Sequence, residues 1–153
     1  MCSICGEIDF SGATSPDALR EMSSTLVHRG PDASGDFCDS CVTLCHNRLA
    51  VVDVENGAQP MSVIYGNKKY TIVYNGELYN TAELRQLLIE LGHKFDGHSD
   101  TEVVLHAYAQ WADACVERFN GIFAFAIWEH KRKKLFLARD RMGVKPLFYK
   151  LHD

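Results

Sequence analysis

The sequence predicts an α+β fold in which helices lie against mainly antiparallel sheets. Two amphipathic helix patterns follow one another in the middle of the chain, and strand patterns flank them on both sides. Toward the end of the chain the strand patterns are separated by short connections, which is typical of hairpins and therefore of antiparallel pairing. Several strand patterns are apolar almost throughout, as expected of strands covered on both faces. These observations together indicate layers of sheet and helix.

Three segments combine helical spacing of apolar residues with start and stop signals. The first opens with a serine N-cap and a proline at the first helical position, and it ends before a Gly-Pro pair. The second has four leucines at positions i, i+3, i+4 and i+7 and ends at a glycine. The third opens with a Ser-x-x-Glu capping box. These helices are expected at about 15–28, 80–92 and 100–111.

Segments rich in β-branched and aromatic residues are expected to form the strands. They are 2–10, 41–53, 69–75, 121–129, 134–140 and 146–150. The basic run "HKRKK" lies between two of them, so we expect a solvated hairpin loop there rather than a phosphate-binding patch. The sequence has no internal repeat or linker, which favours one domain.

The composition limits the class of protein. A chain of 153 residues is long enough for one domain with a single hydrophobic core. The formal charge of −4 argues against a nucleic-acid-binding protein, which normally has a basic face. We see neither an apolar run long enough to cross a bilayer nor a secretion signal. We therefore expect no membrane partner and a cytoplasmic protein with reduced thiols.

The six cysteines include two CxxC pairs, which permits a zinc-binding module. The spacing argues against it, because 32 residues, including a complete helix pattern, separate Cys5 from Cys38. We expect Cys38 and Cys41 to be partners across a two-residue turn, and Cys45 to lie about 13 Å along the strand from Cys41, too far for both to bind one zinc ion. The histidines show no metal-ligand pattern either, so we predict no metal site and keep the zinc module as an alternative.

Cys2 directly follows the initiator methionine. One interpretation is a small apolar residue in an N-terminal strand. The other is a nucleophile, because cleavage after Met1 would place a thiol and a free α-amine on one residue. An α-amine titrates at about pH 8, close enough to neutrality to take the thiol proton directly or through water. The position of the residue alone leaves both interpretations open.

Five stretches, together with Cys2, resemble one family along nearly the whole chain. That family is the glutaminase domain of glutamine-hydrolysing asparagine synthetases, a class II glutamine amidotransferase domain of the N-terminal nucleophile hydrolase fold. Two positions depart from its pattern, Ser3 in place of the usual glycine and Cys5 in place of a small or aliphatic residue, but neither replaces a catalytic group. The stretches are "HRGPD" (28–32), "HNRLAVVD" (46–53), "VYNGELYN" (73–80), "SDTE" (99–102) and "FNGIFAFAIWE…LARDRMGVKPLFY" (119–149).

The resemblance implies a four-layer αββα sandwich, with two mainly antiparallel sheets between helices. It implies that residues 1–153 form a glutaminase domain truncated at its C-terminal end, with the synthetase domain absent. Cys2 would hydrolyse the side-chain amide of L-glutamine through a glutamyl thioester, and the ammonia would serve an ATP-dependent asparagine synthetase reaction. The expected partners are L-glutamine and a synthetase domain in cis or in trans, with homodimerisation left open. We expect no cofactor for this domain, and Mg-ATP only for the missing one; a non-catalytic amidotransferase-like domain is a further alternative.

Asn75 and Gly76 have two interpretations. An Asn-Gly pair after an alternating strand is the strongest short signal for a hairpin turn. However, the alternation then continues only through "ELY" before the next helix begins, so little returning strand is left. The resemblance instead implies that the Asn75 side chain and the Gly76 backbone N–H form an oxyanion hole.

The charged candidates also have alternatives. Arg48 could be a surface arginine in a strand, and Asp100 could serve only the start of a helix, where the dipole favours an acid. The resemblance instead implies that Arg48 binds the α-carboxylate of glutamine, with Val52 beside the substrate. It also implies that Asp100 and Glu77 bind the α-ammonium group, so that opposite charges would set the length of the substrate.

Overall fold

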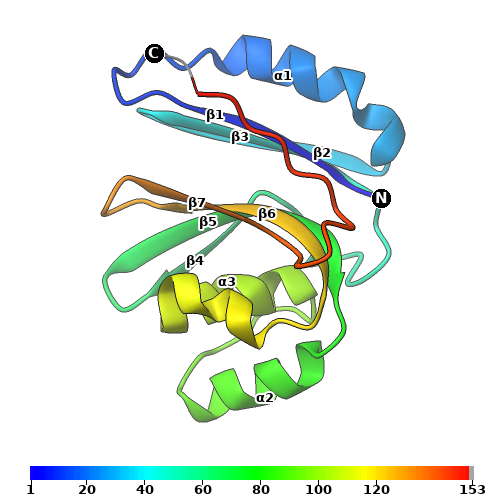
Figure 1. Cartoon of the computed structure of the whole chain (residues 1–153), viewed down its shortest axis with the longest axis vertical. Coiled ribbons are helices and arrows are strands. Elements are labelled where there is room, and N and C mark those ends of the chain that lie inside the picture. Colours follow the sequence, from blue (N-terminus) through cyan, green and yellow to red (C-terminus); the bar gives the residue numbers. More distant parts are fainter. Residues whose placement is uncertain (152–153) are drawn as a thin grey trace.

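The computed structural model describes residues 1–151 and consists of two facing sheets with helices on both outer sides (Figure 1). One sheet has the strand order β1-β3-β2 and the other β4-β5-β6-β7, and all neighbouring strands are antiparallel. Helix α1 covers the first sheet, α3 covers the second, and α2 packs against α3 on the outside (Figure 1). This arrangement is the predicted αββα sandwich. The strands are β1 (Ser3–Ile8), β2 (Ala33–Asp39), β3 (Val42–Arg48), β4 (Met61–Tyr65), β5 (Lys68–Leu78), β6 (Gly121–Glu129) and β7 (Lys134–Arg139).

The three predicted helices are present, with shorter bounds at the first two. They are α1 (Pro16–Thr25), α2 (Thr81–Glu90) and α3 (Asp100–Trp111), and short 3-10 turns follow α1 at Val27–Arg29 and α3 at Ala112–Arg118. Half of the predicted capping box at the start of α3 forms, because the Ser99 side chain accepts a hydrogen bond from the Glu102 backbone N–H at 3.2 Å. The Glu102 carboxylate instead accepts from the preceding loop, at the backbone N–H groups of Asp96 and Gly97.

The second sheet corrects the hairpin interpretation of Asn75 and Gly76. The strand expected at 69–75 extends to Leu78, and within it Asn75 lies opposite Ala124 of β6. The chain does not turn at this pair because β6 pairs with β5 continuously from Tyr70 to Leu78. Pairing with a distant strand therefore overrides a local turn signal.

One other predicted strand is shorter than expected, and one is absent. The strand expected at 41–53 ends at Arg48, where the chain enters a loop. Residues 146–150 form no strand, and Phe148 and Tyr149 are 91% and 76% exposed. The reason is Asp140, whose carboxylate accepts the backbone N–H groups of residues 144 and 145 and turns the chain away from β7. The segment then runs toward the first sheet (Figure 1).

Strands β2 and β4 were not predicted. In β2 most side chains are exposed or half-buried, so its sequence, "ASGDFCD", lacks the apolar alternation that marks a strand. The β2–β3 turn is also displaced by one residue, because Asp39 pairs with Val42 and Cys38 with Thr43. Cys38 and Cys41 were predicted to be partners across this turn, and that prediction was wrong.

The loop between β6 and β7 lies within the basic run "HKRKK", where a hairpin loop was predicted.

The core has one part on each face of the second sheet. On its outer face, Val103 of α3 and Leu88 of α2 share one hydrophobic cluster with Phe125 of β6. Between the two sheets, Leu44 of β3 packs with Val73 and Trp128 of the second sheet. Strands β5 and β6 are consequently buried on both faces, which explains their long apolar runs. None of the helices in residues 1–151 is long and apolar enough to span a membrane.

Candidate active site

The seven predicted site residues line a single cavity of about 280 Å³. It lies where six parts of the chain meet: the start of β1, the end of β3 with the loop that follows, the second half of β5, the first turn of α3, the start of β6, and the segment after β7. The sheets and α3 thus bring together residues far apart in the sequence. They are Cys2, Arg48, Val52, Asn75, Gly76, Glu77 and Asp100.

Cys2 is positioned by the pairing of β1 with β3. Ser3, the first residue of β1, lies opposite Asn47, so the residue before β1 comes next to the end of β3. The Cys2 sulfur accepts a hydrogen bond from the Leu49 backbone N–H at 3.3 Å and donates to the Leu49 carbonyl at 3.7 Å. The backbone of Leu49 is a contact that the sequence analysis missed. The register of the sheet and the contact with the Leu49 backbone together place the thiol at the cavity.

Arg48 is the last residue of β3 and is only 8% exposed, so the surface-arginine interpretation was wrong. Its guanidinium donates to the backbone carbonyls of Val52, Asp53 and Val54 at 3.2, 2.6 and 2.9 Å. An arginine has five N–H groups, so these bonds leave two for a ligand. Arg48 therefore shapes the loop that carries Val52 and still has donors for an anion.

Asn75 and Gly76 form part of the cavity wall in the middle of β5. The Asn75 side chain is 8% exposed, and no group within residues 1–151 hydrogen-bonds to its amide. At Gly76 a Cβ atom would lie 2.5 Å from the Ile122 carbonyl oxygen and 2.7 Å from the Phe123 Cβ, so the close approach of β6 requires glycine. The Asn75 amide is therefore available to a ligand.

Asp100 is fixed by β5 as well as by its place at the start of α3. Its Oδ2 accepts hydrogen bonds from the Tyr74 hydroxyl at 3.0 Å and from the Leu78 N–H at 3.2 Å, and its Oδ1 accepts from the Thr101 N–H at 2.9 Å. Burial raises the pKa of Asp100, and the three hydrogen bonds oppose that shift. Because two of these donors belong to β5, the carboxylate does more than cap a helix. The side chain of Glu77 is exposed at the rim of the cavity.

Several lining residues were not singled out from the sequence. The Gln59 side chain accepts from the Tyr74 N–H at 2.6 Å and donates to the Thr101 hydroxyl at 3.2 Å, which ties the loop after β3 to β5 and α3. Lys145 is buried, and its ammonium group contacts the Met1 sulfur. The signal for Lys145 was its place in the final stretch of the resemblance, whereas nothing in the local sequence marks Gln59.

The structure also bears on the zinc alternative. In the part of the chain that it describes, no group of three or more His, Cys, Asp or Glu side chains is arranged to bind a metal ion. Cys5 lies opposite Cys45, and Cys38 lies opposite Thr43, so the two CxxC pairs do not converge on one point. This geometry gives the zinc-binding module no support.

Comparison with known proteins identifies the family of the chain. A family model described as the glutamine amidotransferase domain matches residues 1–153. Asparagine synthetases (glutamine-hydrolyzing) 3 and 1 of Bacillus subtilis (strain 168) are 52% and 42% identical to the chain over 151 and 153 residues. Both matches cover 97% of the chain, which spans only 25% and 24% of the length of these relatives.

A solved structure supports the fold independently. It is glutamine phosphoribosylpyrophosphate amidotransferase from B. subtilis complexed with ADP and GMP. The TM-score is 0.67 at 21% identity, and the match covers 91% of this chain and 36% of that chain. Since the family model covers the whole sequence and the fold agrees, this chain belongs to the glutamine amidotransferase domain family.

Proposed function

We propose that the chain hydrolyses the side-chain amide of L-glutamine at Cys2 and supplies ammonia to an ATP-dependent asparagine synthetase reaction. The observation that carries this proposal is the convergence of a thiol, a guanidinium, a carboxylate and an unengaged amide on one cavity of about 280 Å³. The names of the two B. subtilis relatives support glutamine as the substrate and asparagine synthesis as the use of the ammonia. The synthetase reaction belongs to a further domain, in cis or in trans, and Mg-ATP acts there. We propose no cofactor for the amide hydrolysis.

The chemistry begins with removal of Met1, which frees the α-amine of Cys2. The amine takes the thiol proton, and the sulfur attacks the amide carbon of glutamine. The Asn75 side-chain N–H and the Gly76 backbone N–H stabilise the negative oxygen of the tetrahedral intermediate. The intermediate collapses to a γ-glutamyl thioester and expels ammonia, which carries away the proton from the amine. Water activated by the same amine then opens the thioester, releases glutamate and restores the thiol.

Two opposite charges orient the substrate. The two N–H groups of Arg48 that the loop leaves unused bind the α-carboxylate, and the Asp100 carboxylate binds the α-ammonium group. Val52 lies beside the substrate, and Glu77 adds negative charge at the rim on the ammonium side. Because both ends of the amino acid are held, the distance from these charges to Cys2 selects the side-chain length of glutamine.

We further propose a cytoplasmic location, where Cys2 stays reduced. Sedimentation velocity of the purified chain would show whether it is a monomer or a homodimer in solution.

The test combines labelling of the nucleophile with turnover. Purified chain is incubated with a glutamine-like chloroketone or diazoketone, and intact mass and peptide mapping locate the adduct. We expect protein that begins at Cys2 and carries one adduct there. Ammonia release from glutamine should be abolished in Cys2→Ala and largely retained in the matched control Cys38→Ala, whose thiol lies on the exposed strand β2.

Three results would contradict the proposal. Active protein that retains Met1 would exclude the α-amine as the base. An adduct on another cysteine would assign the nucleophile elsewhere, and unlabelled protein that still carries Met1 would favour the non-catalytic alternative.

A further inference from the structure

Two cysteines that the proposed function does not use face each other on neighbouring strands. Cys5 of β1 lies directly opposite Cys45 of β3, and both thiols are free. Directly opposed residues of antiparallel strands have Cα atoms roughly 4.5–5.5 Å apart. Disulfide-bonded cysteines have Cα separations of roughly 4.4–6.8 Å. The backbone therefore already holds this pair at disulfide distance.

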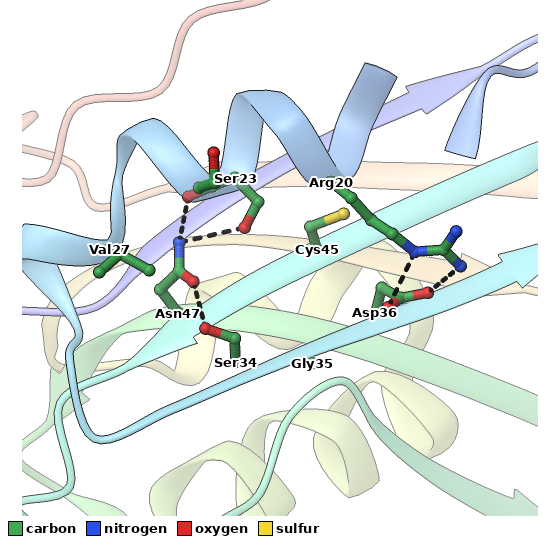
Figure 2. A pocket seen from close by; sticks show the side chains of 9 residues that line it. Arg20, Ser23, Val27, Ser34, Gly35, Asp36, Cys45 and Asn47 are labelled. Carbon is green, nitrogen blue, oxygen red and sulfur yellow. Dashed lines mark hydrogen bonds and ion pairs between the residues drawn. The ribbon is translucent and has the colours of Figure 1, made fainter. Parts of the chain in front are cut away.

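Both thiols lie on the α1 side of the first sheet. The Cys5 sulfur is 3.9 Å from the Leu19 carbonyl of α1. Cys45 lines a second cavity, of about 200 Å³, between α1 and the sheet, and its neighbours there include Arg20 and Asn47 (Figure 2). Cys2 instead lines the first cavity together with Asn75 and Gly76 of β5, on the side of the first sheet that faces the second sheet. Oxidation at this pair is thus spatially separate from the nucleophile.

The surroundings make the two thiols unequal. The neighbouring Cys45 thiol lowers the pKa of Cys5, although burial opposes this shift. The same contact and burial raise the pKa of Cys45, which is only 1% exposed. The thiolate is the form that reacts with oxidants, and Cys5 is also the more exposed of the two. Because Cys5 is the more exposed thiol, an oxidant reaches it first, and Cys45 is in place to resolve the product.

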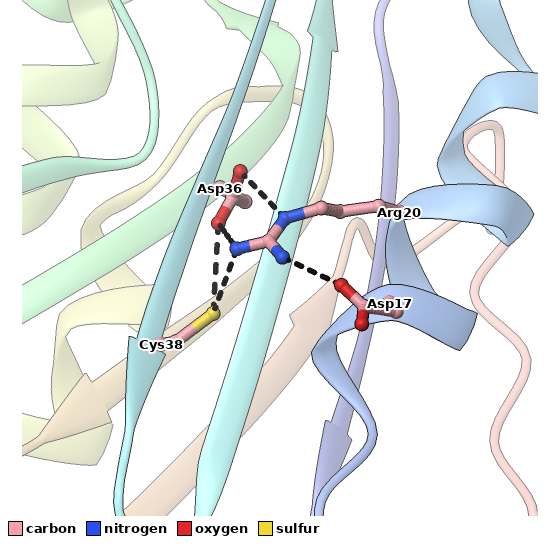
Figure 3. Close-up of polar contacts among 4 residues, drawn as sticks. All are labelled: Asp17, Arg20, Asp36 and Cys38. Atoms are coloured by element: carbon pink, nitrogen blue, oxygen red, sulfur yellow. Dashed lines mark hydrogen bonds and ion pairs between the residues drawn. The ribbon is translucent and has the colours of Figure 1, made fainter.

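The other cysteines lack such a partner within residues 1–151. Cys38 lies opposite Thr43, and its thiol donates to Asp36 at 3.5 Å beside the Arg20 guanidinium (Figure 3). Cys41 lies just before β3 in the core between the two sheets, and Cys115 is buried in the core on the outer face of the second sheet. The cross-strand arrangement is thus specific to Cys5 and Cys45.

We propose that Cys5 and Cys45 form a disulfide when the protein meets hydrogen peroxide. The Cys5 sulfur attacks one peroxide oxygen, the O–O bond breaks, and the departing hydroxide takes up the Cys5 proton as water. The Cys45 sulfur then attacks the resulting sulfenic acid, the S–O bond breaks, and the second hydroxide leaves as water with the Cys45 proton. The two thiols lose two electrons in total, and one peroxide is reduced to two waters.

The disulfide would join the two strands that position the nucleophile. Strand β1 continues directly from Cys2, and β3 leads to Leu49, whose backbone contacts the Cys2 sulfur. The crosslink would fasten these strands to each other without consuming the Cys2 thiol.

The test uses the full chain with Cys2→Ala, so that the outcome does not depend on glutamine hydrolysis and Cys2 cannot compete for the oxidant. The protein is treated with hydrogen peroxide, unfolded in the presence of iodoacetamide, and analysed by intact mass and peptide mapping. We expect loss of two hydrogen masses, three alkylated cysteines, and a linked peptide containing Cys5 and Cys45 that dithiothreitol separates. Adding Cys45→Ser should abolish the linked peptide, whereas adding Cys38→Ser should leave it intact.

Three results would overturn the proposal. One is a linked peptide that joins other cysteines. Another is over-oxidation of Cys5 while Cys45 remains fully alkylated. The last is peroxide treatment that oxidises the exposed Cys38 and leaves both members of the pair reduced.

Discussion

Replacing Asp100 by asparagine should weaken glutamine hydrolysis while leaving the fold at least as stable at neutral pH. Burial raises the pKa of Asp100, so the folded protein binds this proton more readily than the unfolded chain. The stability that this group contributes is present below its unfolded pKa and is lost as the pH rises through its folded pKa. At pH 7 the charged carboxylate therefore costs stability, and a neutral amide removes that cost. The amide oxygen can still accept from the Tyr74 hydroxyl and the Leu78 N–H.

The effect on activity should go the opposite way. If Asp100 binds the α-ammonium group of glutamine, the variant leaves that charge desolvated and without its partner. Truncating one member of such a pair costs about 2–5 kcal/mol, which corresponds to a loss of roughly 30-fold to several thousand-fold in kcat/KM.

The assay compares wild-type protein with Asp100→Asn and with the control Glu77→Gln at the exposed rim of the cavity. Glutamate release gives kcat/KM, and calorimetry at pH 5 and pH 7 gives Tm. We expect Asp100→Asn to raise or preserve Tm at pH 7 and Glu77→Gln to cost less activity, since a charge in contact with water is screened. A stable Asp100→Asn protein with nearly wild-type kcat/KM would refute the role in substrate binding. A marked fall in Tm at pH 7 would refute the electrostatic argument.

Three further predictions follow from the geometry. Arg48→Lys should lower both Tm and kcat/KM, because one ammonium group cannot serve three loop carbonyls and a carboxylate; an unchanged Tm would mean that the loop does not depend on the guanidinium. Asn75→Ala should reduce kcat by about 10²–10³-fold with little change in KM, and a purely KM effect in steady-state kinetics would argue against the oxyanion role. Burial lowers the pKa of His46 and of His106 from 6.5 to about 4, so their contribution to stability is present above pH 6.5 and lost as the pH falls toward 4. Urea unfolding at pH 8 and pH 5 should show a loss of about 2 kcal/mol for each histidine, and His106→Asn should remove the contribution of His106.

The elements that could be predicted from the sequence are those whose own residues carry the signal. The helix at 100–111 has both a capping serine and a buried apolar face, and β6 has a long apolar run. Strand β2 could not be predicted, because its side chains are mostly exposed and its pairing is determined by β3. Asn75-Gly76 shows the opposite failure, in which a strong turn signal is overridden by a partner strand nearly fifty residues away.

The same distinction, between residues marked by the local sequence and residues placed by distant contacts, applies to the candidate site. The positions of Cys2, Arg48 and Asp100 were predicted from stretches that resemble a family, and the cavity brings them together. Gln59 could not be found this way, because its role depends on two contacts, with Tyr74 and Thr101, that exist only in the folded chain.

The contacts of Arg48 also explain why the loop after β3 belongs to the site. A free arginine side chain would lose considerable rotamer freedom on binding a carboxylate. In this fold the loop carbonyls at 52–54 already fix the guanidinium, so that ordering cost is met during folding rather than during binding. The same contacts hold Val52 at the cavity. A substitution in this loop that moves its carbonyls should therefore weaken glutamine binding without touching a group that contacts the substrate.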